Sequence, residues 1–425
     1  MTERLYYSDS FRQSFPARVT DIHELSRTEG QSIWQIALDR SAFYPTSGGQ
    51  PYDLGTLTAT ARSGAVLEVP VLAVEEDEHG EVWHNTLKPL LAGTEIQGTI
   101  DWPRRLDHMQ QHSGQHLLSA VFQKELNATT VSFHLGETAS TIDLAVDSLA
   151  AHSIERVERI VNEQIAEDRA VTMRTVNSEE AKSLLAIGQL RKLPDREGTI
   201  RLIEIADCDL NACGGTHVRS LGQIAGLLIR NIERVRQGMR IEFVCGLRAV
   251  STARQDYATL TRSAALLSTP RTDVPSAIER ILADTKSAAK ERQKLREELA
   301  GYHAARLATE EAITDNLRIV RRTFSDRDAD YIKLLASRLS ALPQTIALLA
   351  STHQEPAFLT FACSSDIKCN AGQVLKETLS QFGLRGGGSA TLAQGQIPQQ
   401  QLNALLDMLE TSVRNLISVA RDNDQ

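Results

Sequence analysis

The sequence lacks any apolar run close to the roughly 20 residues that a bilayer-spanning helix needs. Its first residues, MTERLYYSDSFRQSF, also lack the apolar core of a signal peptide. No internal repeat and no low-complexity segment stands out. We therefore expect no membrane association, a cytoplasmic location, and ordinary globular domains. The length of 425 residues favours more than one domain.

Cysteine is scarce: the chain has five, at positions 208, 213, 245, 363 and 369. This number does not make a disulfide framework in a chain of this length. In a cytoplasmic protein, clustered Cys and His more often serve a metal site or catalysis. The net charge of −8 argues mildly against wholesale binding of a phosphate backbone. It leaves room for a local basic groove, because such binding depends on local charge.

The patterning along the first 250 residues predicts an α+β fold. Residues 1–100 carry β-branched and aromatic runs between Gly, Asp and Ser clusters, which indicates a small β-barrel-like domain. Residues 101–250 predict a central α+β domain with helices over 104–125 and 153–168. Its strands are expected near 131–145 and 171–176, before the segment DCDLNACGGTHVRS, and again up to Gly246.

The last 175 residues or so predict two further parts. Residues 251–317 are helical in pattern, and several apolar residues fall near heptad spacing, although Thr285 and Arg292 interrupt the series. This favours either a helical hairpin or imperfect coiled coil, or a solvated connector helix. Residues 318–425 predict a small α/β domain with buried strands, a glycine-rich turn and a closing amphipathic helix.

Two pairs of potential metal ligands lie far apart in the sequence. The motif HSGQH contains His112 and His116, and the i, i+4 spacing puts both imidazoles on one face of a helix. In CGGTH, Cys213 and His217 flank a turn that contains two glycines. Three nitrogens and one sulfur favour a single Zn²⁺ over copper or nickel.

The role of such a zinc ion stays open on these grounds. Four protein ligands favour a closed, structural site, whereas a catalytic site keeps one position for water or substrate. The metalloprotease pattern HExxH is absent, because Ser113 occupies the position of the general-base glutamate. A peptidase would therefore lack its catalytic group.

These motifs together resemble a known family. HSGQHLLSAVF, CGGTHV and RIEFVCG are similar to the editing domain of alanyl-tRNA synthetases and to its free-standing relatives, the AlaX proteins, in their long form. LDRSAFYPTSGGQPYDLG resembles the glycine motif that precedes this domain, and GQVLKETLSQFGLRGGGSATLAQG resembles a DHHA1 domain. The region before Phe43 is too short for a class II synthetase core, so we do not expect the chain to activate alanine with ATP.

The resemblance implies a zinc-dependent trans-editing hydrolase that deacylates Ser-tRNA(Ala) or Gly-tRNA(Ala). By resemblance, His112, His116, Cys213 and His217 hold the metal and act in catalysis through it. A hydroxyl acceptor would separate serine from alanine, because alanine leaves that acceptor unpaired. The candidates for substrate binding are Ser41, Thr46, Gly48, Gly49, Gln50, Gln115 and Thr216, with Asp53 as a weaker one. TSGGQP alone is equally consistent with a tight surface turn.

The implied partner is the acceptor end of tRNA(Ala). Arginines are expected to line a groove for it, although each is also consistent with a solvated strand edge; they are Arg104, Arg105, Arg219, Arg230, Arg234, Arg236, Arg240 and Arg248. Arg385 with Gly386, Gly387 and Gly388 would let backbone N–H groups approach phosphate. A homodimer through the connector or the C-terminal domain is a further expectation. Two alternatives stay open: a non-catalytic tRNA-binding module with a structural zinc, and an unrelated zinc hydrolase of small esters.

Overall fold

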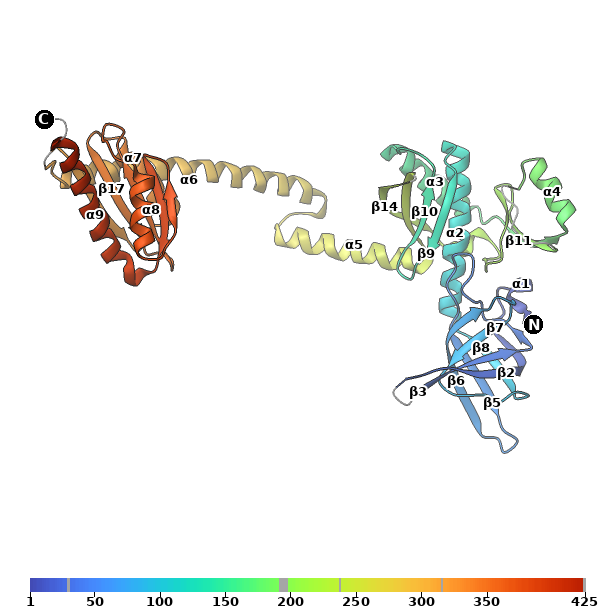
Figure 1. Ribbon diagram of the computed structural model, residues 1–425. Coiled ribbons are helices and arrows are strands. Elements are labelled where there is room, and N and C mark those ends of the chain that lie inside the picture. The colour runs from blue at the N-terminus through green and yellow to red at the C-terminus, as the bar shows by residue number, and fades with distance from the viewer. Residues whose placement is uncertain (29–30, 191–197, 237, 315, 423–425) are drawn as a thin grey trace. The chain divides into compact units, whose positions relative to one another are not determined.

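The computed structural model describes residues 1–28, 31–190, 198–236, 238–314 and 316–422 (Figure 1). The chain forms two compact units, Met1–Arg262 and Ser263–Gln425, and each is described by itself. Among the described residues, no helix is long and apolar enough to span a membrane. The mixed α+β class is confirmed, and the four segment boundaries drawn from the sequence stay predictions.

The first unit begins with a closed six-stranded barrel, as the sequence predicted. Its strands, in their order around the barrel, are β2 (Ser14–Thr28), β3 (Gln31–Leu38), β7 (Val82–Thr86), β6 (Val66–Glu76), β5 (Gly55–Thr60) and β8 (Glu95–Ile100). In β8 every second residue is buried, which is the pattern of a strand with one face on a core. A parallel pair, β1 (Glu3–Arg4) with β4 (Arg40–Ser41), and the short helix α1 (Leu5–Ser8) lie at the start of this unit.

Helix α2 (Trp102–Leu126) follows the barrel and carries the HSGQH motif. The Asp101 side chain caps its N-terminus by accepting a hydrogen bond from the backbone N–H of Arg104, and Pro103 fits a first turn that needs no N–H. Every residue from His108 to Phe122 is buried. The polar side chains on this stretch therefore need partners inside the protein.

Two sheets and a helix contact α2 (Figure 1). One sheet is antiparallel and contains β14 (Leu227–Val235), β15 (Gly238–Cys245), β10 (Ser140–Leu144) and β9 (Thr130–Leu135). The other contains β11 (Val171–Val176), β12 (Ile200–Ile205) and β13 (Asp209–Ala212). Helix α3 (Ala151–Ala166) and the short turn η1 (Leu221–Ile224) complete this core, and α4 (Ser178–Ala186) follows β11.

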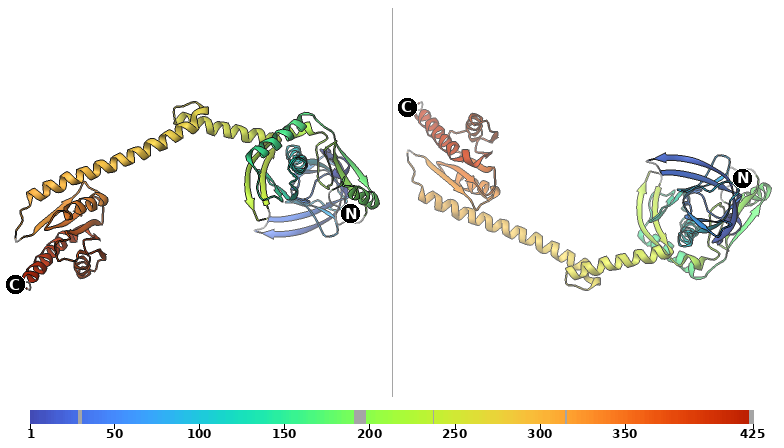
Figure 2. Two further views of the ribbon diagram at one scale, coloured as in Figure 1. Left: turned by 90° about the horizontal axis from the view of Figure 1, so that it is seen from above. Right: turned by 90° about the horizontal axis from the view of Figure 1, so that it is seen from below.

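The second unit is built on a five-stranded sheet. Its strands, in spatial order, are β16 (Arg318–Phe324), β17 (Thr345–Ser351), β18 (Ala357–Cys363), β20 (Leu392–Ile397) and β19 (Gly386–Gly388). One face packs on α7 (Ala329–Ser340) and the end of α6 (Val274–Glu310), and the other on α8 (Ala371–Gln381) and α9 (Gln399–Asp422) (Figure 2). The unit is therefore a three-layer α/β/α sandwich.

Two details differ from the sequence predictions. The helical stretch is divided into α5 (Gly246–Leu266), the turn η2 (Arg271–Asp273) and α6, because Ser268 adopts a left-handed conformation and Pro270 follows it. From 278 to 295 every residue of α6 is exposed. Both alternatives for this region, a helical hairpin or coiled coil and a solvated connector, stay predictions. The three glycines at 386–388, expected as a turn, form β19 and pair with β20.

Candidate metal centre

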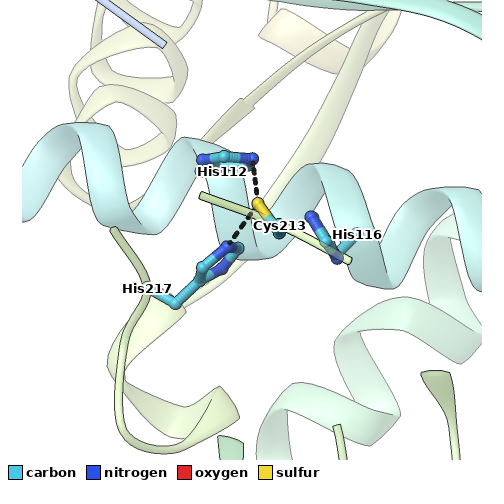
Figure 3. A group of neighbouring side chains, drawn as sticks. All are labelled: His112, His116, Cys213 and His217. Atoms are coloured by element: carbon cyan, nitrogen blue, oxygen red, sulfur yellow. Dashed lines mark hydrogen bonds between the residues drawn. The ribbon is translucent and has the colours of Figure 1, made fainter. Parts of the chain in front are cut away.

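Four side chains from two distant segments meet at one point. His112 and His116 project from α2, and Cys213 and His217 come from the loop after β13 (Figure 3). Their ligand atoms all lie within 4.8 Å of one another. The Sγ atom of Cys213 is 3.5 Å from Nε2 of His112 and 3.3 Å from Nε2 of His217. A separation of about 3.5 Å follows from tetrahedral bonds of about 2.0–2.3 Å to one ion.

The glycines of CGGTH are explained by this close packing. A Cβ atom at Gly215 would collide with the imidazole of His112. The side chain of Arg201, on β12, holds the same loop, because its Nη1 donates to the carbonyl oxygens of Cys213 and Gly215 at 2.8 Å each. The loop can therefore bring Cys213 against the helix only with glycine at position 215.

Each of the three histidines has a polar neighbour at its second ring nitrogen. Nδ1 of His112 is 2.9 Å from Oε1 of Gln50, and Nδ1 of His217 is 3.1 Å from Oγ of Ser113. Nδ1 of His116 lies 3.4 Å from a carboxylate oxygen of Asp209, which is long for a hydrogen bond. Metal-binding histidines usually have such partners, which fix the tautomer and the ring orientation. The arrangement therefore fits a metal site.

The electrostatics of the cluster also favour a cation. Burial lowers the pKa of His217 to about 3, so this ring is neutral. Burial of Cys213 works the other way, but His112 and His217 outweigh it and bring the thiol pKa well below its ordinary value. Burial also lowers the pKa of His116, but Asp209 and Cys213 outweigh it and raise the value to about 9. Zinc binds a thiolate and neutral imidazoles, so a bound cation would replace the proton that His116 carries beside this thiolate.

A cavity of about 560 Å³ lies beside the four residues. Its walls come from the N-terminal segment and glycine motif, from α2 and β9, and from the β12–β13 region. Two of the predicted substrate-binding residues line it, Gly48 and Gln115. Gln115 is buried and its Nε2 donates to Oγ of Ser119, while its Oε1 has no hydrogen-bond partner among the described residues. A buried acceptor left in this state is placed to receive a hydrogen bond from a ligand.

Four other predicted substrate residues are not among those that line the cavity. Gln50 and Thr216 are fully buried and bond to each other, so that the glycine motif is tied to the CGGTH loop. Gly49 has a φ of +82° and would place a Cβ 2.8 Å from the ring of Phe133. Thr46 is exposed.

Ser41, Asp53 and Arg105 need correction. Ser41 is buried at the barrel, with its Oγ 2.8 Å from Nε2 of His84. Arg105 is wholly buried and forms an ion pair with Asp53. A side chain with no exposed surface cannot contact tRNA, and a carboxylate paired in this way is not available to a substrate. The prediction failed because adjacency in sequence does not fix burial: Arg105 is buried, whereas Arg104 is partly exposed.

Most of the other predicted tRNA-binding arginines have acidic partners. Ion pairs join Arg219 to Asp9, Arg230 to Asp256, Arg240 to Asp143, and Arg248 to Asp107. Arg104 donates to the carbonyl of Tyr52, and Arg385 is exposed. Contacts of these residues with tRNA stay predictions.

Sequence reasoning missed part of the cavity wall, namely Arg201, Tyr7, Tyr44 and Asn211. Arg201 comes beside the metal ligands because the backbone N–H of Cys213 bonds to its carbonyl, at 3.1 Å. A lone arginine in the run TIRLIEI carries no signal of this pairing. Tyr7 arrives from an N-terminal turn nearly two hundred residues away in sequence.

Comparison with known proteins gives one family match in each of the two units. The family described as Threonyl and Alanyl tRNA synthetase second additional domain matches residues 200–242, and the DHHA1 domain matches residues 317–415. The alanyl-tRNA editing protein AlaX-L of Pyrococcus horikoshii is 27% identical over 421 residues, which cover 97% of this chain and 100% of that protein.

Longer proteins match as well. The alanine–tRNA ligase of Pyrococcus abyssi is 31% identical over 404 residues, which cover 93% of this chain but 42% of the ligase. The chain thus spans less than half the length of the ligases that it matches. The crystal structure of the C-Ala domain from Aquifex aeolicus alanyl-tRNA synthetase matches 23% of this chain and 96% of that chain, at 24% identity and a TM-score of 0.20, which is too low to carry an argument.

Proposed function

The chain resembles the long AlaX editing proteins along its whole length, and from this premise we propose that it is an aminoacyl-tRNA deacylase. The substrate would be tRNA(Ala) that carries serine or glycine, and the reaction would hydrolyse the ester at the 3′ end. The observation that carries the proposal is the convergence of His112, His116, Cys213 and His217 at the wall of a cavity. A cytoplasmic location and a homodimer stay predictions.

These four residues would hold one Zn²⁺ ion, which when bound supplies a Lewis acid for an ester carbonyl or a water molecule. The chain's own residues do the positioning. Gln50 and Ser113 hold two of the imidazoles through their Nδ1 atoms. The cavity walls hold the ester in one orientation against the reacting groups.

Gln115 is proposed to provide selectivity for serine. Its Oε1 is buried and unpartnered among the described residues, one position before His116. The serine hydroxyl can donate to this oxygen, whereas alanine leaves it unpaired in a buried place. Sites built around such a hydrogen bond reject the analogue that lacks the donor far better than sites that rely on size.

A second function is favoured by one observation, the number of protein ligands. Four ligands from the chain would complete the tetrahedral coordination of the ion and leave no position for water or substrate, as in structural zinc sites. The chain would then be a tRNA-binding module without catalysis. The unpartnered Gln115 oxygen and the cavity beside the cluster argue for the deacylase, because a structural site needs neither.

The test is a deacylation assay with Ser-tRNA(Ala), Gly-tRNA(Ala) and Ala-tRNA(Ala), run beside a measurement of bound metal. Release of serine or glycine, but not of alanine, supports the proposal. Cys213→Ala should lose both the metal and the turnover. Cys208→Ala is a matched control, because Cys208 lies five residues away and outside the four-residue cluster.

Other outcomes contradict the proposal. Binding of tRNA without release of any amino acid would support the tRNA-binding module. Hydrolysis of small esters with no dependence on tRNA would support a general esterase. Full turnover by metal-free Cys213→Ala would show that the metal takes no part in the hydrolysis.

A further inference from the structure

Arg201 brings a positive charge to the cavity that no described carboxylate balances. The described residues that line the cavity include no Asp, Glu or Lys, so Arg201 is the charged side chain in this wall apart from the metal cluster. No ion pair between Arg201 and an acid occurs in the part of the chain that the structure describes. Asp209 stands next to His116 and is not among the described lining residues.

The guanidinium of Arg201 is held in one orientation by backbone oxygens. Its Nε donates to the carbonyl of Tyr7 at 3.1 Å, and its Nη1 donates to Cys213 and Gly215. The ring of Tyr7, whose centroid is 5.7 Å away, packs against it. Nη2 has no partner among the described residues. The side chain is thus fixed by three carbonyls and keeps the two N–H groups of Nη2 for a ligand.

A cation in this position is costly for the empty protein. Carbonyl oxygens satisfy N–H donors but do not supply a countercharge, so this half-buried cation gains most from an anionic ligand. The two N–H groups of Nη2 can donate to phosphate or carboxylate oxygens.

Resting on the proposed function, we propose that Arg201 binds the phosphodiester on the 5′ side of the terminal nucleoside of the aminoacylated RNA. In such a substrate the ester at the 3′ end and this phosphate are one ribose apart. Arg201 donates to the carbonyl of Cys213, a residue of the candidate metal cluster, so its guanidinium lies beside that cluster. A cavity of about 560 Å³ lies within the range of small-ligand sites and leaves room for a nucleoside with its amino acid.

The phosphate dependence can be measured with two small substrates, 3′-O-seryl-adenosine and its 5′-monophosphate. The wild-type protein should show a lower KM for the phosphorylated ester. Arg201→Gln should raise the KM for the phosphorylated ester by about 10- to 100-fold more than it raises the KM for the unphosphorylated ester, which is the loss expected for one charge-assisted hydrogen bond to phosphate. Arg201→Lys should recover part of the difference, since it keeps the charge. Bound metal is measured for each variant.

Arg174→Gln is the matched control, because Arg174 lies on the neighbouring strand β11, pairs with Glu180 on the surface and is not among the lining residues. It should behave as the wild type with both substrates. If Arg201→Gln loses metal and activity on both esters alike, Arg201 only supports the loop and the proposal is overturned. It is also overturned if free serine inhibits the wild type but not Arg201→Gln, because the anion would then be a carboxylate.

A binding experiment separates this inference from the proposed function. Calorimetric titration with 5′-AMP and with adenosine needs no turnover. Tighter binding of 5′-AMP that disappears in Arg201→Gln supports the phosphate site even if no ester is hydrolysed. Deacylation with no preference for the phosphorylated ester would keep the proposed function and reject the phosphate site.

Discussion

The ion pair between Asp53 and Arg105 joins the glycine motif to the helix that carries the two histidines. Both side chains are fully buried. Nε of Arg105 is 3.0 Å from each carboxylate oxygen of Asp53, and a carboxylate oxygen also accepts the N–H of Tyr44 at 2.6 Å. Arg105 donates further to the carbonyls of Ser10 and Ala42. Four segments of the first unit therefore depend on one charged pair.

Asp53→Asn keeps the size of the side chain and removes its charge. The guanidinium of Arg105 is then buried without a countercharge, and breaking a buried pair in this way costs about 3–5 kcal/mol. In a unit of this size each kcal/mol lowers the melting temperature by about 2–4 °C, so we expect a decrease of roughly 6–20 °C. The melting of the first unit, Met1–Arg262, followed by calorimetry and by urea unfolding, measures this loss.

Two further variants make the test specific. Arg105→Met combined with Asp53→Leu should recover part of the loss, because apolar replacement of a whole buried pair is often tolerated. Asp9→Asn breaks an exposed pair with Arg219 and should cost no more than about 1 kcal/mol. If Asp53→Asn costs as little as Asp9→Asn, the buried pair does not hold these segments together and the reasoning fails.

Three other predictions follow from single contacts. Ser41→Ala should lower the free energy of unfolding of the first unit by about 1–3 kcal/mol, because it leaves Nε2 of His84 buried without a partner. Urea unfolding measures this loss. A change in serine selectivity without a loss of stability would show that Ser41 binds the substrate after all. Burial lowers the pKa of His84 from its ordinary 6.5 to about 4, so the neutral ring contributes stability that is complete above pH 6.5 and is lost towards pH 4, by about 3 kcal/mol in all. Melting temperatures over this range should fall less for His84→Gln, and equal slopes would contradict the assignment. Gln115→Leu should reduce the preference for Ser-tRNA(Ala) over Ala-tRNA(Ala) by about tenfold or more in the deacylation assay; an unchanged ratio would show that another group receives the serine hydroxyl.

Local patterns were sufficient for much of the fold. Alternation and β-branched runs indicated the barrel, and the i, i+4 histidines indicated the buried helix, because both patterns depend on residues close in sequence. The pairing of HSGQH with CGGTH was inferred because both ligand pairs occur in one chain, and the family resemblance implied the same four residues. The glycine-rich segment at 386–388 misled the prediction, because a strand at the edge of a sheet and a turn can share this composition.

The side-chain environment was where sequence reasoning failed. Arg105 and Ser41 looked like surface or substrate residues and are buried, whereas Arg201 and Tyr7 gave no signal and line the cavity. Adjacent residues such as Arg104 and Arg105 differ only in the direction that each takes from the helix. Whether a residue of α2 is buried depends on the segments that pack against the helix, such as those that bond to Arg105.

The amino-acid sequence by itself determined the kinds of element, the four candidate metal ligands and the resemblance to an editing family, because each of these depends on residue type and short-range spacing. The tertiary structure alone decided which polar groups face the cavity and which form hydrogen bonds or ion pairs inside the protein. Partners such as Gln50 with His112, or Arg201 with Cys213, are far apart in the chain or carry no pattern. Their proximity results from long-range packing, in which buried polar groups must find partners wherever the fold brings them together.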